Sequence, residues 1–212
     1  MLKYVLHSIL MVVLTAEATA QKTLQKSWDA HRFEQVEIIS DAIFKIKVTS
    51  GMTDTITLAA RIEGEFSENI LVEAKDPELD NGKLLLTIGY SPYFEPKNDK
   101  LAAHKVDAIE MELYLPPQKD LLVRSALASV NTFGPLRNLR LELENGSCEL
   151  RNFEGNARLV TQSGSILVHG TNFAQIDAET STGTLVDQLP KGGRYRLEVK
   201  SVNGDITLLS SQ

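Results

Sequence analysis

Short runs of alternating apolar and polar residues fill the C-terminal half of the chain, and they recur as four copies. Each copy surrounds a glycine, with apolar residues seven and five positions before it and two and four positions after it. These glycines are Gly146, Gly164, Gly183 and Gly204, so successive copies are 18, 19 and 21 residues apart. A spacing of two residues is the side-chain period of a β-strand. Each copy is therefore predicted to form a strand, a glycine turn and a second strand, with one face buried.

Fifteen of the sixteen equivalent positions are apolar, and this predicts how the copies pack. They are Leu139, Leu141, Cys148, Leu150, Ala157, Leu159, Ile166, Val168, Ile176, Ala178, Leu185, Leu197, Val199, Ile206 and Leu208. A two-strand unit cannot bury its apolar face alone, whereas stacked copies cover one another with like side chains. We therefore predict an all-β fold: a parallel β-helix-like stack of short strands with glycine corners, preceded by an irregular layer of β-strands. A β-sandwich of regularly spaced hairpins is the alternative, but it gives no reason for the repeat.

The residues around each glycine predict the corners of the stack. Asn, Ser, Thr and Asn precede the four glycines; such residues satisfy turn backbone locally, and glycine adopts positive φ at little cost. A fifth, weaker copy has Ala128 at its corner and Leu121, Val123 and Val130 at the equivalent apolar positions. We call the column of equivalent apolar positions along the stack the apolar ladder. Degenerate copies are typical of the ends of a stack. The last copy is expected to leave an open edge at the C-terminal end, a place for homo-oligomerisation.

The preceding part of the chain alternates as well, but without a regular repeat. Strand patterns occur in residues 44–48, 56–62 and 109–115, and Asp80-Asn81-Gly82 is a strong turn signal. There is no long helical pattern and no flexible Gly/Ser linker after residue 20. We predict one all-β domain over residues 21–212, with the repeat region at about 119–210.

Residues 1–20 have the pattern of a secretory signal peptide. Lys3 gives a positive start, residues 4–14 form a short apolar run, and Ala18-Thr19-Ala20 is a cleavage pattern that would leave Gln21 first. The apolar run is too short for a stable membrane anchor. The expected location is therefore secreted or periplasmic, in the cell envelope, with no transmembrane anchor after cleavage.

Charge and cysteine content narrow the function classes. The 212 residues carry a formal net charge of −6, which disfavours nucleic acid as a partner. The chain has one cysteine, Cys148, so an intramolecular disulfide is excluded. Its place on the apolar ladder predicts a small core hydrophobe, with a catalytic or intermolecular thiol as the alternative.

The sequence offers few candidates for chemistry. The histidines after residue 20 are His31, His104 and His169, and none has metal-ligand spacing with another histidine or with the cysteine. Phosphate-loop, dinucleotide and nucleophile-elbow motifs are absent. We therefore predict no catalytic residues, no cofactor and no metal site.

Acidic residues are the remaining candidates, and we interpret their clusters as solvated faces rather than calcium sites. The clusters are Glu63, Glu65 and Glu68; Asp76, Glu78 and Asp80; and Glu142 and Glu144. Asp187 interrupts the apolar ladder, and burying it unpaired would be costly. The favoured interpretation is that Val186 points inward and a bulge turns Asp187 outward. The alternative is a functional carboxylate beside Arg151 or Arg194.

With these features in place, the chain resembles the putative adhesin domains of bacterial envelope proteins, including the GIN-type head domain. The resemblance covers roughly residues 36–210 and is carried by Phe44–Val48, Asn81–Leu86, Met111–Pro116 and the Ser/Asn/Thr-Gly turns. It implies a β-helix-like fold, secretion and no known catalytic residues. Ala128 departs from the pattern, because a glycine corner would fall there.

The expected function is that of a secreted or periplasmic, non-enzymatic adhesin-like domain that presents a rigid β surface. Its expected partners are an envelope protein or a glycan, with homo-oligomerisation through the C-terminal edge. A polysaccharide-active β-helix enzyme is one alternative. A structural or signalling envelope protein is another.

Overall fold

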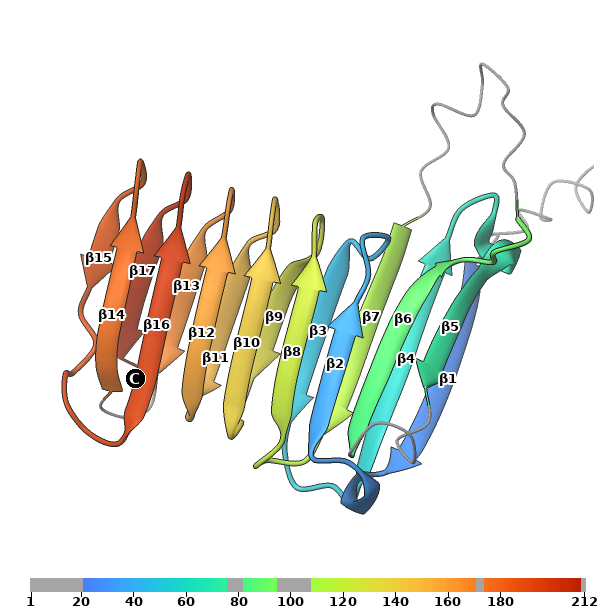
Figure 1. Cartoon of the computed structure of the whole chain (residues 1–212), viewed down its shortest axis with the longest axis horizontal. Coiled ribbons are helices and arrows are strands. Elements are labelled where there is room, and N and C mark those ends of the chain that lie inside the picture. The colour runs from blue at the N-terminus through green and yellow to red at the C-terminus, as the bar shows by residue number, and fades with distance from the viewer. Residues whose placement is uncertain (1–20, 76–81, 95–107, 171–173, 211–212) are drawn as a thin grey trace, which may run out of the picture.

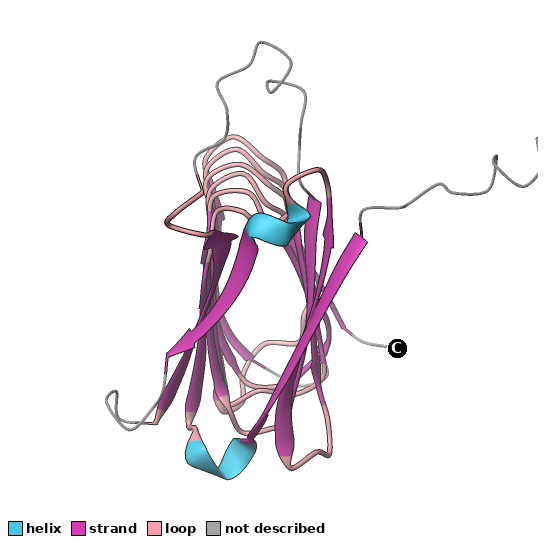
Figure 2. Cartoon of the chain, turned by 90° about the vertical axis from the view of Figure 1, so that its right-hand side faces the viewer, coloured by secondary structure: helices cyan, strands magenta, loops and turns pink. Residues whose placement is uncertain are grey.

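The chain folds into two long β-sheets that face each other (Figure 1, Figure 2). The computed structural model describes residues 21–75, 82–94, 108–170 and 174–210. The predicted signal peptide lies outside these described residues. Two 3-10 turns, η2 (Ala30–Arg32) and η3 (Ser67–Asn69), are the helices of the described chain, and neither is long enough to cross a membrane. The predicted fold class, an all-β stack of short parallel strands, is confirmed.

Each sheet runs the length of the molecule, and the strands below are given in spatial order. Sheet A contains β1 (Gln21–Asp29), β4 (Thr55–Glu63), β7 (Ala108–Leu115), β3 (Lys45–Ser50), β9 (Ser129–Phe133), β11 (Cys148–Phe153), β13 (Ile166–Gly170), β17 (Ile206–Ser210) and β15 (Leu185–Asp187). Sheet B contains β14 (Ala174–Thr180), β16 (Tyr195–Ser201), β12 (Asn156–Thr161), β10 (Asn138–Leu143), β8 (Asp120–Ser125), β2 (Gln35–Ile39), β6 (Lys83–Tyr90) and β5 (Ile70–Lys75).

The predicted copies form the rungs of the stack, where a rung is one strand of sheet B, a corner and the next strand of sheet A. They are β8/β9, β10/β11, β12/β13, β14/β15 and β16/β17. Equivalent ladder residues pair in parallel register: Ile166 lies beside Ile206, and Ile206 beside Leu185. Ile166 and Ile206 are fully buried. The core is therefore the column of like side chains that the repeat predicts.

The order of the rungs in space differs from their order in the sequence. β16 lies between β12 and β14, and β17 lies between β13 and β15. The expectation that the final copy forms the open edge is therefore wrong. The open end of the stack is the preceding copy, β14/β15, at the left of Figure 1.

The N-terminal part is more regular than the predicted irregular layer. β2 and β3 add a rung in parallel register beside β8 and β9, and β6 and β7 add another beyond them. The strands that close this end, β1, β4 and β5, are antiparallel to their neighbours. Lys22 and Lys26 on β1 reach across to the opposite sheet, where Lys26 Nζ donates to the Val72 carbonyl oxygen at 2.8 Å.

Corner glycines are required by close packing of the rungs more than by positive φ. Of the four predicted corners, Gly164 has positive φ (152°), whereas Gly146, Gly183 and Gly204 do not. A Cβ on Gly204 would lie 2.0 Å from the Gly164 carbonyl oxygen, and one on Gly183 would lie 2.2 Å from the Gly204 carbonyl oxygen. The same contact relates Gly164 to Gly146, and Gly146 to Ala128. Each of the four glycine corners thus lies against the carbonyl of the rung beside it, leaving no room for a side chain.

Small hydroxyl residues three positions before the corners complete this arrangement. Thr161 Oγ1 donates to the Gly164 carbonyl oxygen at 3.1 Å, and Thr180 Oγ1 donates to the Gly204 carbonyl oxygen at 2.8 Å. Thr161 and Ser201 are buried and hydrogen-bond each other at 3.1 Å. The corner carbonyls therefore keep hydrogen-bond partners inside the stack, as buried backbone groups require.

Candidate functional site

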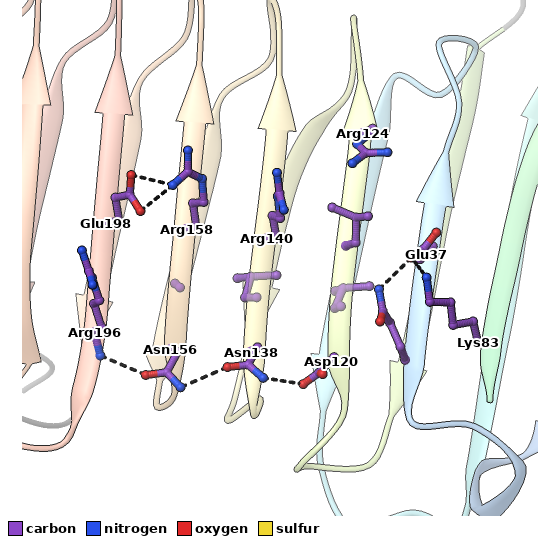
Figure 3. A pocket seen from close by; sticks show the side chains of 15 residues that line it. Glu37, Lys83, Asp120, Arg124, Asn138, Arg140, Asn156, Arg158, Arg196 and Glu198 are labelled. Atoms are coloured by element: carbon purple, nitrogen blue, oxygen red, sulfur yellow. Dashed lines mark hydrogen bonds and ion pairs between the residues drawn. The ribbon is translucent and has the colours of Figure 1, made fainter. Parts of the chain in front are cut away.

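An open groove of about 630 Å³ lies on the outer face of sheet B, across β6, β2, β8, β10, β12 and β16 (Figure 3). Its side chains form rows because the strands are parallel and in register. In the strand register Asn138 lies beside both Asp120 and Asn156, and Arg140 lies beside Arg158. Neighbouring strands are roughly 4.8 Å apart, so each row repeats at that interval along the stack.

The lower row of the groove is a continuous chain of hydrogen bonds. Asn138 Nδ2 donates to Asp120 Oδ1 at 2.8 Å, and Asn156 Nδ2 donates to Asn138 Oδ1 at 3.0 Å. The Arg196 backbone N–H then donates to Asn156 Oδ1 at 3.0 Å (Figure 3). Because each amide is held on both sides, this row has a fixed pattern of donors and acceptors.

Above it lies a group of arginines that share carboxylate partners. Glu142 accepts from Arg124 Nε and from Arg140 Nε, both at 2.6 Å. Arg158 Nη1 donates to both oxygens of Glu198, at 2.7 and 2.6 Å. Burial acts to raise the pKa of Glu142, but the hydrogen bonds from the two arginines outweigh it, and the net pKa is lowered. Glu142 therefore stays ionised and keeps both guanidinium groups in place.

The groove has an excess of positive charge although the chain as a whole is acidic. Five basic and three acidic side chains line it, and Glu142, the partner of Arg124 and Arg140, is a fourth acid, against a net charge of −6 for the whole sequence. The exposed Arg196 makes no ion pair with any described residue. The groove therefore offers an anion at least one uncompensated guanidinium beside the amide row.

The carboxylates of the groove are placed for charge pairing rather than for acid–base chemistry. Glu37 pairs with Lys83 at 3.2 Å, and Asp120 with Arg137 at 2.8 Å. A glycosidase needs one carboxylic acid with a raised pKa, whereas the pKa of Glu142 is lowered. Within the described ranges, no three His, Cys, Asp or Glu residues gather as a metal site would require.

Asp187, the one candidate side chain of the sequence, occupies a different place from the one predicted. β15 pairs with β17 in regular register, so Asp187 lies beside the buried Leu208, while the exposed Val186 lies beside Thr207. The predicted bulge is therefore wrong. Asp187 lies on the inner side at the open end of the stack, where Lys191 Nζ pairs with it at 3.1 Å.

The expected arginine partners of Asp187 are bonded elsewhere. Arg151 pairs with Glu149, and Arg194 pairs with Glu154. The described geometry therefore brings neither arginine to the Asp187 carboxylate.

Cys148 is a buried core residue, as predicted from its ladder position. Burial raises the pKa of its thiol to about 12. His31 lies on η2 and His169 on β13, two elements that do not adjoin, and His104 is outside the described residues. Of the acidic clusters, Asp76, Glu78 and Asp80 are also outside them.

Sequence reasoning missed the rows of the groove, although a signal for them exists. Asn138 and Asn156 are 18 residues apart, as are Arg140 and Arg158, at equal offsets from Gly146 and Gly164. Repeated outward residues predict polar rows just as repeated inward residues predict the core. Glu142 was expected to be part of a solvated face, whereas it bridges two arginines.

Fold and groove together define a stacked β-solenoid with one ordered, charged outer face, an architecture that presents extended surfaces for binding. Residues 133–211 match the Toastrack DUF4097 family model, which covers the rungs from the end of β9 to β17. The expected resemblance to the putative adhesin domains is confirmed at the level of the fold.

Solved structures resemble the chain at low sequence identity. A structure described as a putative cell adhesion protein from Clostridium sporogenes has a TM-score of 0.59 and 11% identity, covering 90% of this chain and 100% of that one. One described as a putative adhesin from Parabacteroides distasonis has a TM-score of 0.43 and 11% identity, covering 88% of this chain and 97% of that one. At this identity the first likeness shows a shared fold. Comparison with curated proteins gives no significant match.

Proposed function

We propose that the chain is a non-enzymatic, adhesin-like binding module of the cell envelope, and that the groove on sheet B holds an acidic glycan. The observation that carries this is the excess of basic side chains in the groove of an acidic chain, where Arg196 forms no ion pair with the described residues. The signal-peptide pattern of residues 1–20 supports a location outside the cytoplasm.

The shape of the groove favours a linear polymer over a small anion. The groove crosses six strands, and its rows repeat at roughly 4.8 Å per strand. A chain laid along the stack would meet the amide row on one side and guanidinium groups on the other. Asn138 and Asn156 could then bind sugar hydroxyls, while Arg140 and Arg196 pair with carboxylates of the polymer.

The test is a binding measurement with polygalacturonate as the acidic polymer and dextran as the neutral one. We expect residues 21–212 to bind polygalacturonate with an affinity that falls as salt is added. We expect no binding to dextran. The variant Arg140→Gln/Arg196→Gln should lose at least tenfold in affinity. This double variant leaves Glu142 with an ion-pair partner, because Glu142 keeps Arg124.

Arg61→Gln is the matched control, because Arg61 is an exposed, ion-paired arginine on sheet A. It should bind like the wild type. Equal affinity of the wild type and the double variant, or equal affinity for the two polymers, would overturn the proposal.

A further inference from the structure

The two ends of the stack differ in how their edge strands are protected. At the β1/β5 end, Lys22 and Lys26 point inward and donate to carbonyl oxygens of the opposite sheet, Lys26 to Val72 at 2.8 Å. Inward-pointing charges of this kind prevent another strand from pairing with an edge. At the opposite end, β15 is three residues long and carries the inward-facing Asp187, which pairs with the exposed Lys191 beyond the strand. The seven residues of β14 contain neither proline nor lysine, and the described loop after β15 covers this edge at Ala174.

The backbone of β14 has pairing groups directed away from the sheet. In the described chain β14 pairs with one strand, β16. Ala174 turns its N–H to the Pro190 carbonyl oxygen and accepts from the Gly192 N–H at 3.0 Å, both in the loop beyond the edge. Alternate residues of a strand direct their backbone groups to the same side. Ile176 and Ala178 therefore direct their N–H and C=O groups away from β16, where no described residue pairs with them, beside the partly buried end of the core.

The outer side chains of β14 indicate which kind of strand would fit beside it. Gln175, Asp177 and Glu179 are exposed and alternate along the strand. A strand added at this edge would place its own outer residues directly beside Asp177 and Glu179. Opposite charges at such cross-strand positions are favourable, and like charges are unfavourable.

This charge pattern argues against a second copy of the chain as the occupant. Antiparallel pairing of two β14 edges centred on Ala178 would bring Asp177 of each copy beside Glu179 of the other. Lys200, which lies beside Glu179 on β16, already pairs with it at 2.9 Å. The expected homo-oligomerisation is thus disfavoured at the edge that is open.

We propose that the β14 edge receives a β-strand from another protein, one with lysine or arginine at alternate positions. Backbone hydrogen bonds to Ile176 and Ala178 supply the pairing, and Asp177 and Glu179 select the basic partner. The added strand extends sheet B at its end and shields Ile176 from water. This site lies beyond the sheet B groove, and it is independent of the glycan proposal.

The experiment uses a fluorescein-labelled seven-residue peptide of alternating valine and lysine, with fluorescence anisotropy as the readout. Two control peptides carry glutamate in place of lysine, or the same valines and lysines grouped in two blocks. We expect residues 21–212 to bind the alternating lysine peptide at least tenfold more tightly than either control. Equal binding of the block peptide would show charge attraction without strand pairing and would overturn the proposal.

Two further measurements make the outcome specific to the β14 edge. Asp177→Lys/Glu179→Lys should reverse the preference to the glutamate peptide, whereas Glu73→Lys, on the edge strand β5 at the other end, should not change it. Amide hydrogen exchange of Ile176 and Ala178 should slow when the lysine peptide binds. Unchanged exchange at these amides would refute the proposal. So would sedimentation showing that residues 21–212 alone form a dimer in which these amides are already protected.

Discussion

Replacing the corner residue Gly204 by alanine tests whether the rungs stack as closely as the structure shows. Gly204 lacks positive φ, so alanine is acceptable to the backbone itself and the effect comes from the contact alone. The new Cβ would lie 2.0 Å from the Gly164 carbonyl oxygen, whereas ordinary contact begins at 3.4 Å. The corner would have to move by about 1.4 Å. It has no space on the other side, because Gly183 is packed against the Gly204 carbonyl in the same way.

Such a shift breaks the hydrogen bonds that join this corner to the rung beside it. Val202 N–H donates to the Thr161 carbonyl oxygen at 3.2 Å, and Asn203 N–H donates to the Gln162 carbonyl oxygen at 2.9 Å. Lengthened by more than 1 Å, neither would remain a hydrogen bond. Their loss costs about 1–3 kcal/mol, and overpacking adds about 1–3 kcal/mol. The expected destabilisation is therefore about 2–6 kcal/mol.

Urea and thermal unfolding of residues 21–212, followed by circular dichroism, measure this effect. A domain of this size loses about 2–4 °C in Tm per kcal/mol, so the melting temperature should fall by roughly 4–24 °C. Gly89→Ala is the control: it lies within β6, and an added Cβ would meet nothing within 4 Å. It should be neutral or slightly stabilising. If both alanine variants unfold like the wild type, the carbonyl-to-glycine stacking is wrong.

Further predictions follow from the core, the cysteine and the groove. Ile166→Ala should lower the free energy of unfolding by about 2–5 kcal/mol, measured by urea unfolding. Leu185→Ala, on the same ladder but 43% exposed at the open end, should lower it by less than about 1 kcal/mol. Equal losses would contradict the rung order. Cys148, whose pKa burial raises to about 12, should react with a thiol reagent at pH 8 when the protein is unfolded and not when it is native; rapid native labelling would contradict its burial. The folded pKa of Glu142 is lowered, so its stabilising contribution is present above the unfolded pKa of about 4.3 and is lost as pH falls through the folded pKa. Glu142→Gln should therefore reduce the acid-side slope of stability, and an identical slope in the variant would argue against the arginine bridge.

The core of the fold was predictable because its determinants are local and repeated. The offsets around Gly146, Gly164 and Gly204 specify both the strands and the inward residues, and Ile166 beside Ile206 is the pairing that they imply. The reason for glycine was harder to foresee. Positive φ and close backbone contact favour the same residue, and the contact arises between rungs that are 18 or more residues apart.

The groove was predictable in part. Arg140 and Arg158 stand at equal offsets in neighbouring copies, and so do Asn138 and Asn156. Arg196 joins them because β16 lies between β14 and β12, and so pairs with β12, although β14 separates the two strands in the order of sheet B strands along the chain. Its role in the groove therefore depends on rung order, which no local pattern specifies.

Rung order is hidden from periodicity because every copy offers the same ladder to its neighbours, yet one residue does distinguish the end of the stack. Asp187 interrupts the apolar ladder of the third copy. Placed between two rungs, its carboxylate would be buried with apolar residues on both sides, at a cost of several kcal/mol. At the open end it keeps partial access to water and pairs with Lys191 at 3.1 Å. The fourth copy has Leu208 at the equivalent position, fully buried between Val168 and Asp187. The exchange of the last two rungs therefore places the polar ladder residue where it costs least, and an interrupted ladder position marks the end of a stack even when it is not the end of the chain.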